Sequence, residues 1–255
     1  MINIIAKLLR KENVYMNIQP DLTESLKKRQ KINRYSQWMY NNFKQYIGRR
    51  VLDIGSGTGN IISFFVNECE KVVATDIFTE EIQYMKNRFK TNSNFECIMF
   101  DISKDDIFEL KEFCFDTVTC VNVLEHIEDD LDAVKKMKEI VARNGKIVIL
   151  VPAMSKAYGT MDKACGHYRR YDKGDLEKIA DTLGLKIISN KYMNPFGLIP
   201  WIIKGTIQKK QSTFSDDLGD KTSSLYNLAA CVLENIEKVI KAPFGISQIV
   251  VLEKD

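Results

Sequence analysis

Residues 51–60, VLDIGSGTGN, decide the fold. A short apolar run containing Asp53 is followed by glycines at positions 55, 57 and 59. This pattern predicts a buried parallel strand that ends in a glycine turn, with Thr58 placed to begin a helix over residues 58–68. Such a turn lets a ligand approach the backbone, and the N–H groups at a helix start favour polar or anionic ligand atoms. We therefore expect a ligand site that includes Asp53, Gly55, Ser56, Gly57, Thr58 and Gly59.

The form of this turn separates two cofactor classes. A dinucleotide-binding turn reads G-x-G-x-x-G, and here Asn60 stands in place of the last glycine. The Asp53 carboxylate would repel a diphosphate, but it suits a cation such as an α-amino group. The pattern D-x-G-x-G-x-G resembles motif I of the class I S-adenosylmethionine (SAM)-dependent methyltransferases, in which Glu often stands where this chain has Asp53. An ordinary strand-to-helix turn without a ligand is the alternative.

Two further strand patterns end in an acid. They are KVVATD at 71–76, which ends at Asp76, and FECIMF at 95–100, which precedes Asp101. Because the carboxyl ends of parallel strands meet at one crevice, we expect both acids to lie near the glycine turn. Asp76 would accept hydrogen bonds from ribose hydroxyls, unless it caps the next helix, for which Thr79 is the better candidate.

A SAM molecule would use all three acids. We expect Asp53 to pair with its amino group and Asp101 to accept a hydrogen bond from the adenine amino group. Ile77 and Ile102, which directly follow Asp76 and Asp101, are placed to enclose the ring between them.

The fourth strand pattern lies within residues 115–130, FDTVTCVNVLEHIEDD. DTVTCV is the strand, and NVLEHIEDD follows it. Its end resembles the segment of the same methyltransferase class that closes the crevice beside the transferable methyl. The resemblance implies that Asn122 offers its backbone to the cofactor and that His126 lines the reaction pocket. His126 without a chemical role, as a polar helix-start residue, is the alternative. We interpret the acids at 128–130 as first-turn residues that interact with the helix dipole, in preference to metal ligands.

A strand at 146–153 is followed by the loop SKAYGTMDKACGHYRRYDKGDL, residues 155–176. We expect this loop to face the crevice from the acceptor side, with His167 or His126 as general base for a hydroxyl acceptor. An amine acceptor would need no base. The alternative for the two arginines is pairing with acids of the protein body. The candidate acceptor-binding side chains are Asp162, Tyr168, Arg169, Arg170, Tyr171 and, further along the chain, Trp201.

Alternating strands and helices predict an α/β fold with a mostly parallel sheet and helices on both faces. The resemblance implies the Rossmann-like class I methyltransferase fold with seven strands. We divide the chain into an N-terminal helical lid (1–47) and a SAM-binding methyltransferase domain (48–255), with a cap-like insertion at 195–244 before the last strand. Trp201 in the insertion is interpreted first as core, then as an acceptor wall or a membrane-touching patch.

An aromatic stripe lies in the expected lid, at Tyr35, Trp38, Met39 and Phe43. Its spacing places these side chains on one helix face. The stripe either packs on the core or covers the cofactor, with Tyr35 or Trp38 reaching it.

The charge distribution and the cysteines indicate possible binding partners and the cellular compartment. Residues 1–50 carry eleven Lys/Arg against three Asp/Glu, although the net charge of the chain is only +3. This surplus suits nucleic acid or a membrane surface, but we favour a solvated helix face. Six cysteines without C-x-x-C spacing indicate buried thiols in a reducing compartment. No apolar run approaches the length of a membrane span, so we expect a cytoplasmic protein, with peripheral membrane contact left open.

From Tyr35 onward the motifs RYSQW, LDIGSGTGN, ATDI, VLEHIEDD, YGTMD, GHYRRY and PFGISQIVV resemble a bacterial subfamily of these enzymes. Its members tailor saccharides and other small or lipid-linked metabolites. The resemblance implies SAM-dependent methyl transfer to an O or N atom of such a molecule, with S-adenosylhomocysteine as product and no metal. One alternative is an RNA, DNA or protein methyltransferase, which the absence of an N-P-P-Y tetrapeptide disfavours for nucleic acid. A non-catalytic SAM-binding partner protein is the other.

Overall fold

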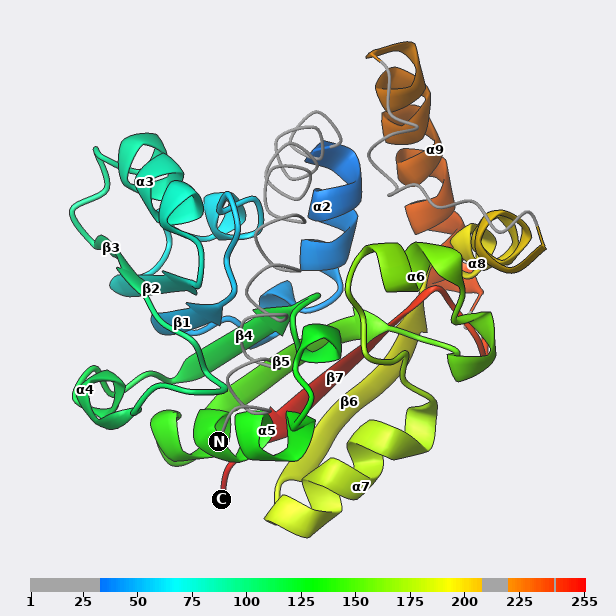
Figure 1. Cartoon of the computed structure of the whole chain (residues 1–255). Coiled ribbons are helices and arrows are strands. Elements are labelled where there is room, and N and C mark those ends of the chain that lie inside the picture. The colour runs from blue at the N-terminus through cyan, green and yellow to red at the C-terminus, as the bar shows by residue number, and fades with distance from the viewer. Residues whose placement is uncertain (1–32, 208–219, 241) are drawn as a thin grey trace, which may run out of the picture.

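One sheet organises the computed structural model, which describes residues 33–207, 220–240 and 242–255 (Figure 1). Its strand order is β3-β2-β1-β4-β5-β7-β6. β7 runs antiparallel to both of its neighbours, and the remaining neighbours pair in parallel. The predicted seven-stranded, mostly parallel sheet is therefore confirmed. The strands are β1 Arg50–Ile54, β2 Lys71–Asp76, β3 Phe95–Met99, β4 Thr117–Val121, β5 Lys146–Pro152, β6 Lys186–Met193 and β7 Ser247–Glu253.

Helices cover both faces of this sheet because its central strands are apolar on both sides. In β1, Leu52 and Ile54 pack into one core, and Val51 packs into the core on the opposite face. The first face carries α4 Phe108–Lys111, α5 Asp130–Ile140 and α7 Lys173–Leu183, and the second carries α2 Asn33–Asn41 and α3 Thr79–Arg88. The other helical segments are α6 Thr160–Ala164, α8 Pro195–Ile202, α9 Asp220–Val239, the 3-10 turns η1 Lys44–Tyr46, η2 Ile62–Phe64, η3 Leu124–His126 and η4 Ser155–Ala157, and the π-helical turn η5 Ile203–Ile207.

The helix predicted for residues 58–68 is wrong. The chain there forms consecutive turns, with η2 as its single 3-10 element. The run from Ile61 to Val66 is dominated by β-branched and aromatic residues, which lose side-chain freedom in an α-helix. No regular helix N-terminus therefore faces the glycine turn.

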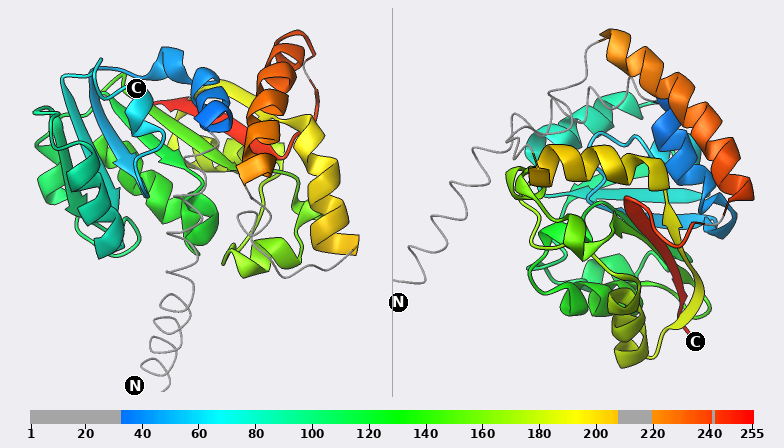
Figure 2. Two further views of the ribbon diagram at one scale, coloured as in Figure 1. Left: turned by 90° about the horizontal axis from the view of Figure 1, so that it is seen from above. Right: turned by 90° about the vertical axis from the view of Figure 1, so that its right-hand side faces the viewer.

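The N-terminal helix α2 and the insertion helix α9 lie side by side (Figures 1 and 2). The Trp38 indole N–H donates to Glu237 at 2.7 Å, and the Asn41 side-chain amide donates to Glu234 at 2.8 Å. Trp38 and Phe43 are fully buried in the core, so the stripe packs on the core at these two positions. Tyr35 is half-buried, with its ring 5.8 Å from that of Trp38. Residues 1–32 of the expected lid lie outside the described residues.

The insertion between β6 and β7 contains α8, η5 and α9, as Figure 2 shows from two sides. The Asn194 side chain caps α8 by accepting from the Gly197 N–H at 2.9 Å, and Glu237 of α9 accepts from the Asn194 N–H at 2.7 Å. The apolar stripe of α9 is exposed, at 66% for Leu228 and 53% for Val232. Glu234 and Glu237 of this helix thus bond to α2, whereas Ala230 and Leu233 pack into the core and Leu228 and Val232 lie at the surface.

Cysteine burial is mixed. Cys97 and Cys120 are buried as predicted, but Cys114 is exposed in the turn before β4. Among the described residues, no helix combines the length and the apolar character needed to cross a bilayer.

Candidate functional site

The glycine turn after β1 is tied to the end of β2. Gly55, Gly57 and Gly59 all have positive φ, at 65°, 55° and 71°. The Gly57 N–H donates to the Asp76 carboxylate at 2.7 Å, and the Ser56 N–H donates to the Thr75 carbonyl at 2.8 Å. The left-handed backbone explains why glycine stands at these positions.

Protein side chains fill the space beside two of these glycines. A Cβ on Gly55 would lie 2.4 Å from Val123, and a Cβ on Gly59 would lie 2.5 Å from the Phe89 ring. The sequence pattern predicted a ligand in this space. The structure shows instead that the segment after β4 packs against Gly55 and that the end of α3 packs against Gly59.

Asp53 lies inside the protein, with 4% of its surface exposed. The Thr119 hydroxyl on neighbouring β4 donates to its carboxylate. Burial raises the pKa of Asp53 to about 6, and the negative charge of Asp76 acts in the same direction against the hydrogen bond from Thr119. A nearby cation stabilises the charged form of a buried carboxylate. Asp53 is therefore suited to the predicted contact with an amino group.

Asp76 accepts one backbone hydrogen bond on each carboxylate oxygen, from Gly57 and, at 3.1 Å, from Phe78. Burial raises the pKa of Asp76 although these hydrogen bonds oppose the shift. The prediction that Thr79 caps the following helix is wrong, since Phe78 holds the N-cap position of α3 without a side-chain bond. Each oxygen of Asp76 retains a lone pair, so the carboxylate can still accept ribose hydroxyls.

The third acid is held within its own loop. Asp101 accepts from the Ser103 N–H at 2.9 Å and forms an ion pair of 3.0 Å with Lys104. Burial raises its pKa, but these partners outweigh burial and lower it overall. Ile77 is 44% exposed, whereas Ile102 is buried in the core beneath α5. The prediction that both isoleucines enclose a ring is therefore corrected to Ile77 alone.

Two more predicted cofactor residues flank the turn. Thr58 is buried, and its hydroxyl has no hydrogen-bond partner. Asn122, directly after β4, has a φ of 55° and donates its N–H to the Leu150 carbonyl at 2.8 Å. The backbone N–H of Asn122 is thus already used within the sheet.

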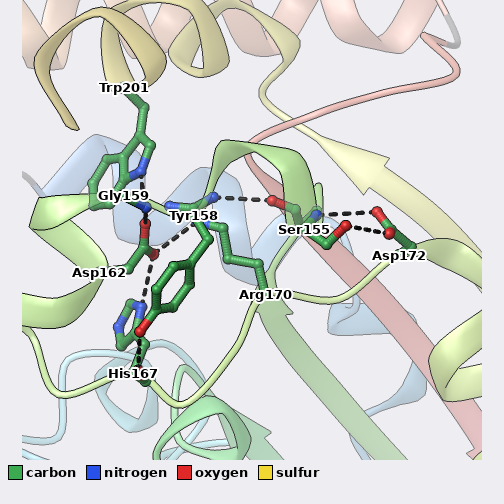
Figure 3. Close-up of polar contacts among 9 residues, drawn as sticks. Ser155, Tyr158, Gly159, Asp162, His167, Arg170, Asp172 and Trp201 are labelled. Atoms are coloured by element: carbon green, nitrogen blue, oxygen red, sulfur yellow. Dashed lines mark hydrogen bonds and ion pairs between the residues drawn. The ribbon is translucent and has the colours of Figure 1, made fainter. Parts of the chain in front are cut away.

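Asp162 is the centre of the loop that follows β5 (Figure 3). It is fully buried, and one carboxylate oxygen lies 2.7 Å from Arg170 Nε and 2.9 Å from His167 Nδ1. The other oxygen accepts from the Gly159 N–H at 2.9 Å and from the Trp201 indole at 3.3 Å. Burial raises the pKa of Asp162, but the hydrogen bond from His167 and the charge of Arg170 outweigh burial and hold it below its usual value.

These contacts give Asp162 a positioning role and correct its prediction as an acceptor ligand. Arg170 is equally enclosed, with 1% of its side chain exposed; it donates to the Ala153 carbonyl and lies 4.6 Å from the Trp201 ring centre. Trp201, which is half-buried, therefore joins the insertion to this loop.

The remaining basic and aromatic residues of the loop divide into two groups. Arg169 forms an ion pair of 2.6 Å with Asp130, and buried Tyr171 donates to the same carboxylate at 2.9 Å. The alternative of pairing with acids of the body thus accounts for Arg169, whereas Arg170 pairs with Asp162 of its own loop, and Tyr171 belongs to the core. Tyr168 is 40% exposed and can meet an acceptor.

The structure brings the two histidines together although 41 positions separate them. The rings of His126 and His167 lie 4.8 Å apart in an edge-to-face arrangement, and both residues are half-buried. The Tyr168 N–H donates to the Glu125 carbonyl at 2.8 Å, which holds the loop against η3. Sequence reasoning missed Glu125, which is buried next to His126, and its position in the VLEH motif was the available signal.

Known proteins resemble this chain in part. Residues 52–147 match the family model described as methyltransferase domain. A ubiquinone biosynthesis O-methyltransferase of Paracidovorax citrulli is 28% identical over 38% of this chain and 41% of its own length. Norajmaline N-methyltransferase of Rauvolfia serpentina is 24% identical over 55% and 47%. The chain thus spans less than half of these curated relatives.

Among solved structures, a SAM-dependent methyltransferase from Archaeoglobus fulgidus superimposes with a TM-score of 0.56. The match covers 85% of this chain and 91% of that one at 17% identity. Together with the strand order, this confirms the predicted class I, Rossmann-like SAM-dependent methyltransferase fold.

The residues at the carboxyl ends of these strands fit SAM, the cofactor in the name of the superimposed Archaeoglobus fulgidus structure. Carboxylates lie at the ends of β1 and β2, the buried Thr58 hydroxyl lacks a hydrogen-bond partner, and Ile77 exposes an apolar surface. The carboxylate of β1 matches an amino group, that of β2 matches a ribose, and Ile77 matches a purine. The Thr58 hydroxyl is available to a polar ligand atom.

Proposed function

We propose that this chain transfers a methyl group from SAM to an O or N atom of a small molecule, because residues 52–147 match the family model described as methyltransferase domain and the sheet has the class I strand order. The acceptor class we propose is a saccharide or another secondary or lipid-linked metabolite. One observation carries the proposal: Asp53 and Asp76 at the carboxyl ends of β1 and β2, and the His126–His167 pair in the segments after β4 and β5, lie at one edge of the sheet, where these four strands are parallel.

Asp53 would pair with the amino group of SAM, and Asp76 would accept hydrogen bonds from the ribose. Bound there, SAM supplies an electrophilic methyl on its sulfonium. The chain's own contribution is to orient the acceptor and to exclude water. His126, His167 and Tyr168 are polar side chains of the acceptor side that are not fully buried.

The names of the matched relatives support a small-molecule acceptor. Both matched curated proteins are named as methyltransferases of small molecules, one of them an O- and the other an N-methyltransferase. A general-base role for either histidine and a cytoplasmic location remain predictions from the sequence. Methyl transfer to RNA, DNA or protein, and binding of SAM without catalysis, are treated as outcomes of the test.

The test is transfer of labelled methyl from SAM by the purified full chain to a panel of saccharides, phenols, amines, RNA and protein. We expect labelled product with a small molecule. His126→Ala and His167→Ala should each lower the single-turnover rate while SAM affinity, measured by calorimetry, stays unchanged. Transfer to RNA or protein alone would overturn the small-molecule proposal. SAM binding without transfer to any acceptor would indicate the non-catalytic alternative.

A further inference from the structure

Three side chains with metal-ligating atoms converge on the acceptor side of the crevice. One ligand atom from each of Glu125, His126 and His167 lies within 4.8 Å of the other two. Glu125 and His126 belong to η3, and His167 comes from the loop after α6. The resemblance to class I methyltransferases predicted no metal, and the acids considered as metal ligands in the sequence were those at 128–130, outside this group.

We propose that Glu125, His126 and His167 bind one divalent transition-metal ion of the Zn²⁺ type. Two imidazoles and one carboxylate are a donor set that Zn²⁺ takes in proteins, with a further coordination position left for water or substrate. Both histidines are half-buried and Glu125 is buried, so an ion can reach the site from solvent on the side of the imidazoles.

The surroundings of His167 are those of a metal ligand. Metal-bound histidines usually donate their second ring N–H to a carboxylate or a carbonyl, which sets the tautomer and the ring orientation. His167 Nδ1 lies 2.9 Å from Asp162, whose carboxylate also accepts from the buried Arg170 guanidinium (Figure 3). A carboxylate in an ion pair only accepts hydrogen bonds, so Nδ1 carries a proton, and in the neutral form of the ring Nε2 has the lone pair that a metal ion needs.

The backbone of His167 is fixed as well. The Tyr158 hydroxyl donates to the His167 carbonyl at 2.7 Å, and the His167 N–H donates to the Asp162 carbonyl at 3.0 Å. Because η3 is joined to the same loop through Tyr168 and Glu125, the ligands are held in place before an ion arrives.

The consequence for chemistry rests on the proposed function. An ion at this site would coordinate a hydroxyl of the acceptor and lower the pKa of that hydroxyl, which makes its oxygen a better nucleophile. The oxygen would then form the new bond to the methyl carbon as the carbon–sulfur bond breaks, and the hydroxyl proton would pass to water. An oxygen acceptor is therefore favoured over a nitrogen acceptor.

Binding is tested on the full chain, stripped with a chelator and titrated with Co²⁺ or Zn²⁺ alone, without SAM. We expect one equivalent of Co²⁺ with a d–d absorption band that Zn²⁺ displaces. His126→Ala and His167→Gln should each weaken binding at least about 100-fold, and Asp162→Asn by roughly 10- to 100-fold. Glu128→Gln, which alters an exposed acid three residues from Glu125, is the matched control and should bind as the parent does.

Circular dichroism identifies any variant that fails to fold, and His126→Gln then replaces it. The proposal is overturned if the parent chain gives no Co²⁺ band, or if its affinity equals that of the folded histidine variants. The two proposals fail separately. A chain that binds Co²⁺ but methylates nothing contradicts only the function, and one that methylates at full rate without binding metal contradicts only this site.

Discussion

The Asp76 carboxylate at the end of β2 accepts a hydrogen bond of 2.7 Å from the Gly57 N–H in the turn after β1. One side chain therefore shapes the turn and also presents acceptor oxygens at the crevice. A substitution at Asp76 therefore changes both the turn and the contact with a ligand. Asp76→Asn and Asp76→Ala should differ in their effect on SAM affinity.

Asp76→Ala should weaken SAM binding by roughly 30- to 100-fold, because the ribose loses its acceptor and the Gly57 N–H is left without one. Asp76→Asn should weaken it less, since the amide oxygen still accepts one hydrogen bond. Calorimetry with SAM and with S-adenosylhomocysteine measures both. Equal affinity of Asp76→Ala and the parent chain would remove Asp76 from the cofactor site.

SAM affinity should fall with pH below about 6. The pKa of Asp53 is raised to about 6, so the carboxyl is protonated below that pH and must lose its proton before it can pair with a cation. The dissociation constant should rise up to about tenfold per pH unit below 6 and stay level above it. Calorimetry in buffers of different ionisation enthalpy should show release of a proton near pH 5. Asp53→Asn should bind SAM weakly, and its dissociation constant should not depend on pH in this range. If the pH dependence persists in Asp53→Asn, another group causes it.

Gly55→Ala should destabilise the chain and impair cofactor binding. A Cβ there would clash with Val123, and an alanine at φ 65° costs about 1–2 kcal/mol. Adding Val123→Ala should relieve the clash but leave the backbone cost. Gly174→Ala is the matched control, because its Cβ meets nothing within 4 Å inside α7. The control should be neutral or stabilising by about 0.5–1 kcal/mol in urea unfolding. A Gly55→Ala chain as stable as the parent would contradict the expectation.

Asp162→Ala should lower the free energy of unfolding by about 3–5 kcal/mol, because the buried Arg170 guanidinium loses its counter-charge. The double variant Asp162→Ala/Arg170→Ala should be less destabilised than the sum of the single variants. Asp132→Asn removes a partly exposed ion pair with Lys136 and should cost at most about 0.5 kcal/mol. Urea unfolding of the parent chain, the two single variants, the double variant and Asp132→Asn measures this, and additive effects would show that Asp162 and Arg170 act independently.

The sheet could be predicted because its signals are local. Apolar runs ending at Asp53 and Asp76 predict strands, and alternation with helices predicts parallel pairing, as observed. Local patterns failed where competing local partners exist. Phe78 holds the cap position expected for Thr79, since the Asp76 carboxylate takes the Phe78 N–H, and Ile102 enters the core beneath α5.

The sequence by itself thus determined the mostly parallel sheet, the glycine turn and the acids near the carboxyl ends of the first three strands, because each depends on residues near one another in the chain. Only the tertiary structure decided that His167 lies against His126, that Asp162 and Arg170 form a buried pair, and that α2 packs on α9. Those contacts join segments far apart in sequence, and side-chain packing and charge neutralisation select them, neither of which a periodic pattern records.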